Sequence, residues 1–149
     1  MELDHIDRKL IDMLNKNARC SLKHLAESVF LSPPAVAARL DRMEKANVIT
    51  GYHVSVNPEA LGYHIKAFIN LQVNPADKPV FYPFIEEVPN VVACSCVTGD
   101  YSMLIEVLFE NTSQLDSFIG GLQRFGKTYT QIVFSTPVEH RSAMIRQED

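Results

Sequence analysis

The sequence predicts an α+β protein in two parts, a helix-turn-helix with a small β element followed by a ferredoxin-like βαββαβ domain. Apolar residues recur at helical spacing in three segments before residue 47, and they alternate at strand spacing in several segments after residue 63. The composition, 46% hydrophobic and 21% charged, is typical of a globular protein. We expect a first domain over residues 1–60 and a second over residues 61–149.

The first part contains three segments that each begin with a good helix cap. Asp4, Ser21 and Ser32 precede the three apolar-periodic runs, and side-chain oxygens of these residue types accept hydrogen bonds from free N–H groups at a helix start. Pro33 suits the first turn of the third helix, where no N–H is needed. We predict the recognition helix of a helix-turn-helix over Pro33–Ala46.

The end of the third helix and the following linker also carry local signals. Asn47 follows the helix, where a residue that tolerates the left-handed conformation is expected. Val48–Asn57 alternates around Gly51, which predicts a small β-hairpin, or wing, that leads into a linker strand. Pro58 and Gly62 mark the boundary of the first domain.

The second part alternates strands with two helical segments. Lys78–Val88 carries a proline inside its helical pattern, Pro83, so this helix is expected to be kinked or to start late. A turn at Gly99–Ser102 separates the second and third strands. The predicted order is strand His64–Val73, helix Lys78–Val88, strand Val91–Thr98, strand Met103–Phe109, helix Thr112–Phe125 and strand Thr128–Val138.

Charge and cysteine content limit how the protein could bind DNA and in which compartment it is expected. The net charge is −4, but residues 1–60 are neutral and the acidic excess lies in residues 61–149, so DNA affinity would need clustered bases and several copies of the chain. No apolar run is long enough to cross a membrane, and the acidic N-terminus is unlike a signal peptide. We expect a soluble cytoplasmic protein whose cysteines are reduced, with Cys94 and Cys96 as small buried residues on one face of a strand.

The third helix favours DNA binding over a plain three-helix bundle, although both share the apolar pattern. Its exposed first turns carry small residues, which permit close approach to a groove. Arg39 and Arg42 lie off the apolar stripe, where they could reach phosphates or guanine edges. The candidate DNA-binding residues are Ser32, Pro34, Ala35, Ala37, Ala38, Arg39 and Arg42.

Several short motifs together resemble one family. They are Leu3-Asp-x-x-Asp7, Ile11-x-x-Leu14, Leu25-Ala26, Leu31-Ser32, Val36-x-x-Arg39, Val48-Ile-x-Gly-Tyr52 and Val97-Thr-Gly-Asp-Tyr101. As a set, over about residues 2 to 141, they resemble the Lrp/AsnC family, the leucine-responsive or feast/famine regulators. The resemblance implies a winged helix-turn-helix joined to a RAM-type domain that senses amino acids and oligomerises. It also implies dimers, formed by pairing of the sheets, that assemble into larger rings, often octamers, on double-stranded DNA.

The resemblance places a small effector, typically an amino acid, at interfaces between dimers near the Gly-Asp turn. A glycine there lets backbone amides approach a carboxylate, and Asp100 could hold an ammonium group. From the residues alone, a tight turn whose aspartate accepts its own backbone N–H is the other interpretation. The candidate effector residues are Gly99, Asp100, Tyr101, Ser102, Ser135 and Thr136, with the last two on the final strand.

Two positions depart from the family pattern. Ser102 stands where the family often has a second acid, which removes one partner for an amino group. Phe30 stands where the family often has glycine in the turn of the helix-turn-helix, and such a turn is feasible if the preceding residue ends the helix differently.

The alternatives to an effector-responsive regulator are an architectural DNA-binding oligomer and a tetrapyrrole decarboxylase on the same architecture. The enzyme would need a histidine-bearing site in the second domain, where His64 and His140 lie in no pocket-forming motif. The sequence predicts no catalytic residue, no metal site and no cofactor.

Overall fold

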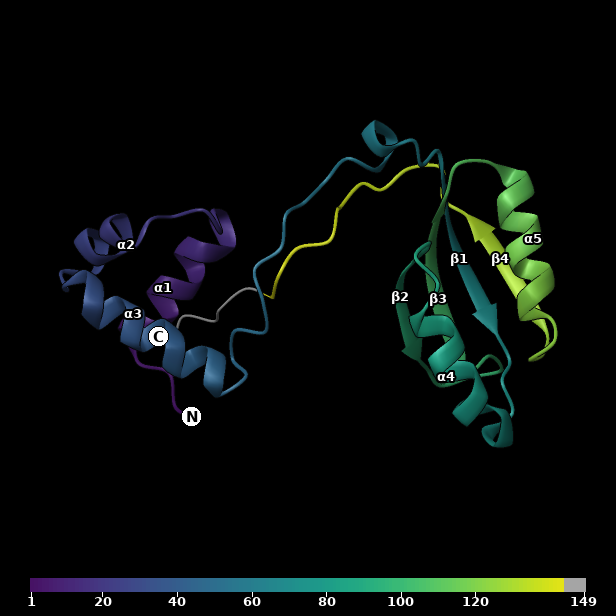
Figure 1. Cartoon of the computed structure of the whole chain (residues 1–149), viewed down its shortest axis with the longest axis horizontal. Coiled ribbons are helices and arrows are strands. Elements are labelled where there is room, and N and C mark those ends of the chain that lie inside the picture. The colour runs from purple at the N-terminus through teal and green to yellow at the C-terminus, as the bar shows by residue number, and fades with distance from the viewer. Residues whose placement is uncertain (144–149) are drawn as a thin grey trace. The chain divides into compact units, whose positions relative to one another are not determined.

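The computed structural model describes residues 1–143, and the chain divides into two compact units (Figure 1). Of the described residues, 1–55 and 139–143 form the first unit, and 56–138 form the second. In the described part of the chain, no helix has the length and apolar character needed to cross a membrane.

The first unit is built from α1 (His5–Lys16), α2 (Leu22–Val29) and α3 (Pro33–Lys45). The three predicted caps are confirmed: the side chains of Asp4, Ser21 and Ser32 each accept a hydrogen bond from a backbone N–H in the first turn. The helices enclose a small apolar core of Leu10, Leu25, Ala26, Val29, Val36 and Met43.

Among its described residues, this unit has two non-glycine residues in the left-handed backbone conformation. Asn47, after α3, has φ of 56°, as the sequence predicted. Phe30, after α2, also has φ of 56°, so the turn without glycine forms because Phe30 itself takes this conformation. Its N–H donates to the carbonyl oxygens of Ala26 and Glu27 and thereby closes α2.

The predicted β-hairpin over Val48–Asn57 is wrong. No strand lies between α3 and the 3-10 turn η1 (Pro58–Leu61) in the residues that the structure describes. The N–H groups of Val48 and Ile49 both donate to the Met43 carbonyl oxygen, at 2.9 and 3.3 Å, so the start of the segment closes α3 instead of starting a ladder. Alternation indicates strand spacing, but a strand also needs a partner.

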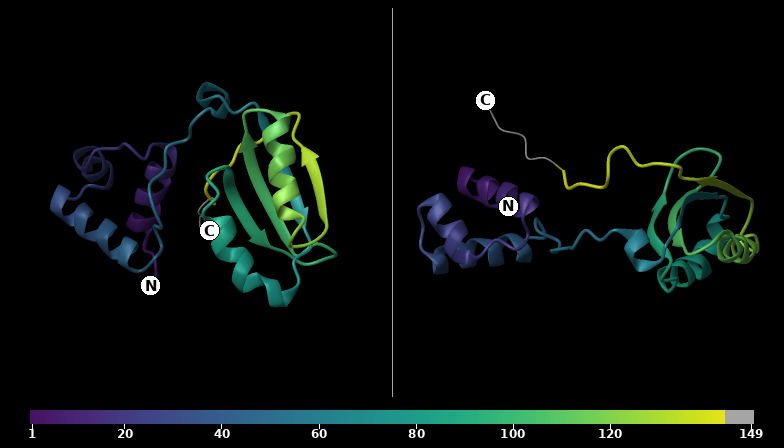
Figure 2. Two further views of the ribbon diagram at one scale, coloured as in Figure 1. Left: turned by 45° about the vertical axis from the view of Figure 1, so that its right-hand side comes forward. Right: turned by 90° about the horizontal axis from the view of Figure 1, so that it is seen from above.

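The second unit has the predicted βαββαβ order. Its elements are β1 (Ile65–Leu71), α4 (Lys78–Glu86) after the 3-10 turn η2 (Pro75–Asp77), β2 (Val91–Cys96), β3 (Met103–Phe109), α5 (Thr112–Leu122) and β4 (Thr128–Ile132). The sheet is antiparallel, with the order β2-β3-β1-β4. Both helices cover one face of it, as the view from above shows (Figure 2).

Strand alternation places the core between the sheet and the helices. Buried residues of β1 and β3 alternate with partly exposed ones, and Ile69 pairs with Ile105 at the centre. This core consists of Ala67, Ile69, Leu71, Val73, Phe81, Ile85, Met103, Ile105, Val107, Phe109, Leu115, Leu122 and Phe125. The opposite sheet face, which we call the open face, carries Phe68, Leu104 and Leu108, all partly buried, and the ion pair Lys66–Glu106 at 3.0 Å.

The expectation that Cys94 and Cys96 are buried is wrong, because both are exposed free cysteines. They lie on β2, which is an edge strand with a neighbour on only one side. The Lys78 ammonium lies 3.7 Å from the Cys96 sulfur at this edge. Periodicity predicts which face a residue occupies, but the strand order decides whether anything covers that face.

Candidate DNA-binding surface and effector turn

The outward side of α3 carries small side chains over its first two turns. Pro34 and Ala38 lie one turn apart and are exposed, while Ala35 and Ala37 are partly buried at the flanks of this face. Ser32 is exposed as well, but its hydroxyl caps the helix by accepting the N–H of Ala35 at 3.4 Å. This side of α3 therefore allows close approach and apolar contact, but it has few polar groups that could hydrogen-bond to base edges.

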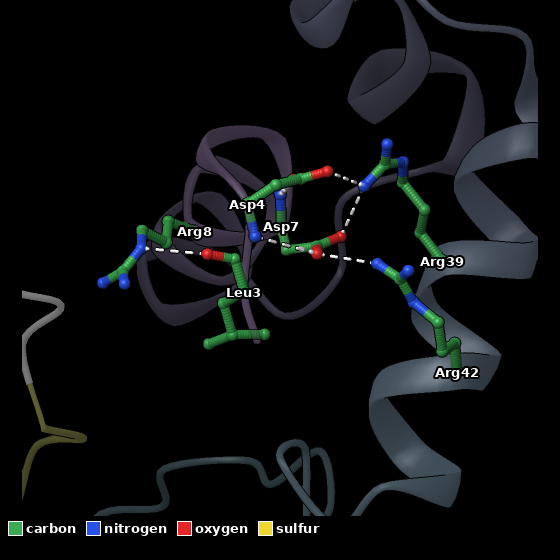
Figure 3. A network of polar contacts seen from close by, with 6 residues as sticks. All are labelled: Leu3, Asp4, Asp7, Arg8, Arg39 and Arg42. Atoms are coloured by element: carbon green, nitrogen blue, oxygen red, sulfur yellow. Dashed lines mark hydrogen bonds and ion pairs between the residues drawn. The ribbon is translucent and has the colours of Figure 1, made fainter. Parts of the chain in front are cut away.

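The two arginines of α3 reach inward, toward the start of α1 (Figure 3). Arg39 donates through Nη1 to Asp4 Oδ2 at 2.7 Å and to Asp7 Oδ1 at 2.8 Å. Arg42 donates through Nη2 to Asp7 Oδ2 at 2.7 Å. We call this set of four side chains the α1–α3 clamp. Asp7 is its centre, because its carboxylate is fully buried and faces both guanidinium groups.

The electrostatics of the clamp follow from these contacts. The backbone N–H of Asp7 and the Arg39 guanidinium lower the pKa of Asp4 to about 2. The carboxylates of Asp4 and Asp7 in turn raise the pKa of Arg39. Asp4 and Asp7 also cap α1 reciprocally, each accepting the other's backbone N–H. Asp4 and Asp7 thus cap the start of α1 and also form the ion pairs that link α1 to α3.

The clamp separates the two arginines as candidates for DNA contact. The Arg39 side chain is 25% exposed and is held by two carboxylates. The Arg42 side chain is 53% exposed, and its single ion pair uses one of several N–H donors of the guanidinium. Arg39 therefore links α3 to α1 through its two ion pairs. Arg42 retains unused guanidinium N–H donors that can reach a DNA phosphate.

A contact that the sequence reasoning missed joins the linker to α3. The Tyr52 hydroxyl donates to Glu44 Oε1 at 2.7 Å, and burial together with this carboxylate raises the pKa of Tyr52 to about 12. The bond holds the start of the linker against the C-terminal half of the recognition helix. A tyrosine eight residues after a helical glutamate matches no local rule, so only the fold could reveal the pair.

The predicted effector turn is a short loop between β2 and β3. The Val97 N–H donates to the Ser102 carbonyl oxygen at 2.9 Å and closes it, and Gly99 within it has φ of 108°. Asp100 is exposed, and its carboxylate has no hydrogen-bond partner within residues 1–143. The interpretation that this aspartate accepts its own backbone N–H is therefore not supported.

Two other candidates beside this turn have structural partners. Ser102 Oγ lies 2.9 Å from the Val73 nitrogen and 3.2 Å from the Val73 carbonyl oxygen, so it links the start of β3 to the end of β1. The Tyr101 ring packs against Tyr129 of β4, with centroids 6.3 Å apart. The serine that replaces an acid in the family pattern thus holds two strands together.

Ser135 and Thr136 are not brought to the turn within one chain. They follow the end of β4 at Ile132, so their assignment to the final strand is wrong. The effector turn lies where β1 ends and β4 begins, while Ser135 and Thr136 lie beyond the other end of β4. Five strand residues correspond to about 17 Å. One site that uses both groups would need two copies of the chain.

Comparison with known proteins agrees with this arrangement. Residues 3–50 match the winged helix-turn-helix DNA-binding family, and residues 66–143 match the Lrp/AsnC ligand binding domain. Fold and sequence thus define a DNA-binding transcription regulator with a separate ligand-binding domain, not an enzyme, and the decarboxylase alternative is discarded. The chain belongs to the Lrp/AsnC family.

Relatives match along most of their length. The chain is 34% identical to the HTH-type transcriptional regulator LrpA of Bacillus subtilis over 132 residues, 88% of this chain and 97% of the relative. It is 30% identical to the regulatory protein AsnC of Escherichia coli over 141 residues, 91% and 93% of the two chains. The structure of B. subtilis LrpC superposes with a TM-score of 0.87 at 28% identity, covering 94% and 100% of the two chains.

Another similar structure was determined with an amino acid bound. It is a feast or famine regulatory protein from M. tuberculosis complexed with L-methionine, with a TM-score of 0.87 and 29% identity. The alignment covers 97% of this chain and 100% of that chain.

Proposed function

We propose that this regulator binds specific double-stranded DNA sites as an assembly of identical chains and that a small amino acid modulates the binding. The observation that carries the proposal is the outer side of α3. This side carries only small side chains over two turns and is followed by the half-exposed Arg42. Because Pro34 and Ala38 supply no side-chain hydrogen bonds, much of the specificity comes from methyl contacts, DNA shape and repeated half-sites.

Salt dependence of DNA binding tests this division of roles on α3. Arg42→Ala should weaken binding on all sequences and reduce the slope of log affinity against log salt by about 0.9, because one phosphate contact is lost. Arg39→Ala should weaken binding through a looser helix while leaving the slope unchanged. The measurement is a salt titration of binding to the DNA upstream of the protein's own gene, with the exposed Lys16 of α1 changed to alanine as control.

No salt-sensitive binding of the unmodified protein to any promoter fragment would overturn the DNA-binding proposal. An unchanged slope for Arg42→Ala would remove Arg42 from the phosphate contacts while leaving the proposal intact.

Self-association is proposed to use the open face of the sheet. Its apolar residues Phe68, Leu104 and Leu108 are covered by no helix, and both described helices of the second unit lie on the other side. A second copy laid on this face would bury them, and two-fold dimers would present paired recognition helices to a pseudo-palindromic site. We propose that such dimers assemble further, to an octamer.

The effector is proposed to bind at the Gly99–Asp100 turn. The exposed, unengaged carboxylate of Asp100 can hold an ammonium group, and the left-handed Gly99 leaves backbone amides accessible to a carboxylate. The relative that binds L-methionine supports an amino acid as ligand. Completion of the site by Ser135 and Thr136 would have to come from another copy.

Sedimentation velocity and thermal unfolding, with and without L-methionine, test assembly and effector together. We expect species heavier than the 16.8 kDa chain, loss of these species in Leu104→Glu, and a methionine-dependent rise of the unfolding temperature. A ligand at 100 times its Kd stabilises by about 2.7 kcal/mol. Asp100→Ala should abolish the response to methionine and leave the assembly unchanged.

A single species at the monomer mass would contradict the proposed assembly. An assembly that responds to none of the twenty amino acids would favour an effector-independent architectural role.

A further inference from the structure

The turn between α2 and α3 carries an aromatic side chain that packs against almost nothing in its own chain. The Phe30 side chain is 92% exposed, and its backbone is in the left-handed conformation with φ of 56° and ψ of 41°. Among the described residues, only one other non-glycine residue, Asn47, has a positive φ, and asparagine tolerates it far better than phenylalanine.

Folding alone does not account for this residue. The left-handed conformation is unfavourable for a bulky side chain, and glycine would form the same turn without that cost. Because 92% of the Phe30 surface is exposed, burial of the ring contributes almost nothing to the stability of the domain. A residue that is strained and unpacked in the free protein points to a contact made outside the chain.

We infer that the Phe30 ring contacts DNA, packing against deoxyribose or thymine methyl groups at the edge of the major groove entered by α3. The inference rests on the proposed DNA binding. Phe30 lies two residues before Ser32, the cap of α3, and a helix-turn-helix presents the N-terminal end of its recognition helix to the bases. The exposed Pro33 and Pro34 continue this surface without a charge or a donor.

A second protein is a poorer fit for the ring than DNA. A stable protein interface needs about 800 Å² from each partner, with a contiguous apolar centre. Phe30 is one ring, and Glu27, one turn back on α2, is exposed. A single ring beside a helix that enters a groove matches apolar readout of thymine methyls, which needs one well-placed side chain.

Removal of the ring should separate stability from binding. We expect Phe30→Gly to leave the unfolding temperature of the full chain unchanged or higher, because the strain is relieved, and to weaken binding to the promoter fragment about 5- to 30-fold, corresponding to 1–2 kcal/mol. The matched control is Asn47→Gly, which relaxes the other left-handed residue and should leave DNA affinity unchanged. Equal DNA affinity of Phe30→Gly and the unmodified protein would overturn the inference.

A tryptophan reporter locates the ring directly, since the chain contains no tryptophan. Phe30→Trp should show a change of emission when the promoter fragment is added, at a protein concentration where assembly is constant. Phe134→Trp, which replaces an equally exposed phenylalanine of the second unit, is the control and should not respond to DNA.

The outcomes distinguish the possible failures. If the unmodified protein does not bind the promoter fragment, the DNA-binding proposal itself is rejected. Emission of Phe30→Trp that changes with protein concentration, but not with DNA, would reject the inference and identify a contact between proteins.

Discussion

Replacing Asp7 with alanine should destabilise the first unit by about 3 kcal/mol, because a buried carboxylate that accepts charge-assisted hydrogen bonds from two partly exposed arginines is lost. The fully buried carboxylate of Asp7 accepts hydrogen bonds from Arg39 and Arg42 and from the backbone N–H of Asp4. Its loss leaves Arg39, itself three-quarters covered, with only the Asp4 carboxylate. Hydrogen–deuterium exchange of the full chain should show α1 and α3 exchanging faster, with α4 and α5 unchanged.

The same helix offers a matched control. Asp12 on α1 pairs with Lys16 at 2.7 Å, but both side chains are more than half exposed. Asp12→Ala should therefore cost no more than about 0.5 kcal/mol. Similar exchange rates for Asp7→Ala and Asp12→Ala would show that the α1–α3 clamp does not stabilise the helix-turn-helix.

A weakened clamp should also impair DNA binding, because α3 is held against α1 by the arginines that follow its small-residue face. Asp7→Asn distinguishes charge from shape, since the amide keeps one acceptor oxygen but carries no charge. We expect its exchange rates and DNA affinity to lie between those of the unmodified protein and Asp7→Ala.

Replacing Gly126 with alanine should destabilise the second unit by about 3 kcal/mol or more, through backbone strain and a displaced strand. A Cβ atom at Gly126 would lie 1.8 Å from the carbonyl oxygen of Gln72, and φ there is 154°. Gln72 cannot move aside freely, because its N–H donates to the Lys127 carbonyl oxygen at 2.9 Å next to the β1–β4 ladder. Equilibrium urea unfolding of the second unit measures the loss.

Gly120 is the control for this change. It lies inside α5, and a Cβ atom there would meet nothing within 4 Å. Gly120→Ala should stabilise the unit by about 0.5–1 kcal/mol, because alanine loses less conformational entropy than glycine in a helix. Equal unfolding free energies for the two alanine variants would mean that the approach of Gly126 to Gln72 is not a tight constraint.

Local signals predicted the elements that depend on neighbours in the sequence. Asp4, Ser21 and Ser32 were identified as caps because capping joins residues three apart, and Asn47 because the left-handed conformation is a property of single residues. The strand Met103–Phe109 was predicted with its observed bounds, since alternation and the flanking turn agreed. The predicted hairpin over residues 48–57 is absent because alternation does not show whether two segments pair with each other.

The candidate sites show the same limit. Arg39 and Arg42 were expected to face DNA because they lie off the apolar stripe, but the stripe does not show that a buried carboxylate on another helix lies beside them. The sequence pattern places Ser102 among the effector ligands, whereas its contact between β1 and β3 is visible only in the paired strands. Ser135 was grouped with the Gly-Asp turn, and the antiparallel direction of β4 separates them.

The sequence by itself thus determined the three-helix motif, the limits of its recognition helix and the βαββαβ order, because caps and periodicity act over a few residues. Tertiary structure decided which charges of that helix are internal, which side chains the sheet edge exposes, and that Phe30 projects unsupported from the turn. These properties depend on contacts between residues far apart in the sequence, such as Arg42 and Asp7, which lie 35 positions apart, and no local pattern encodes such contacts.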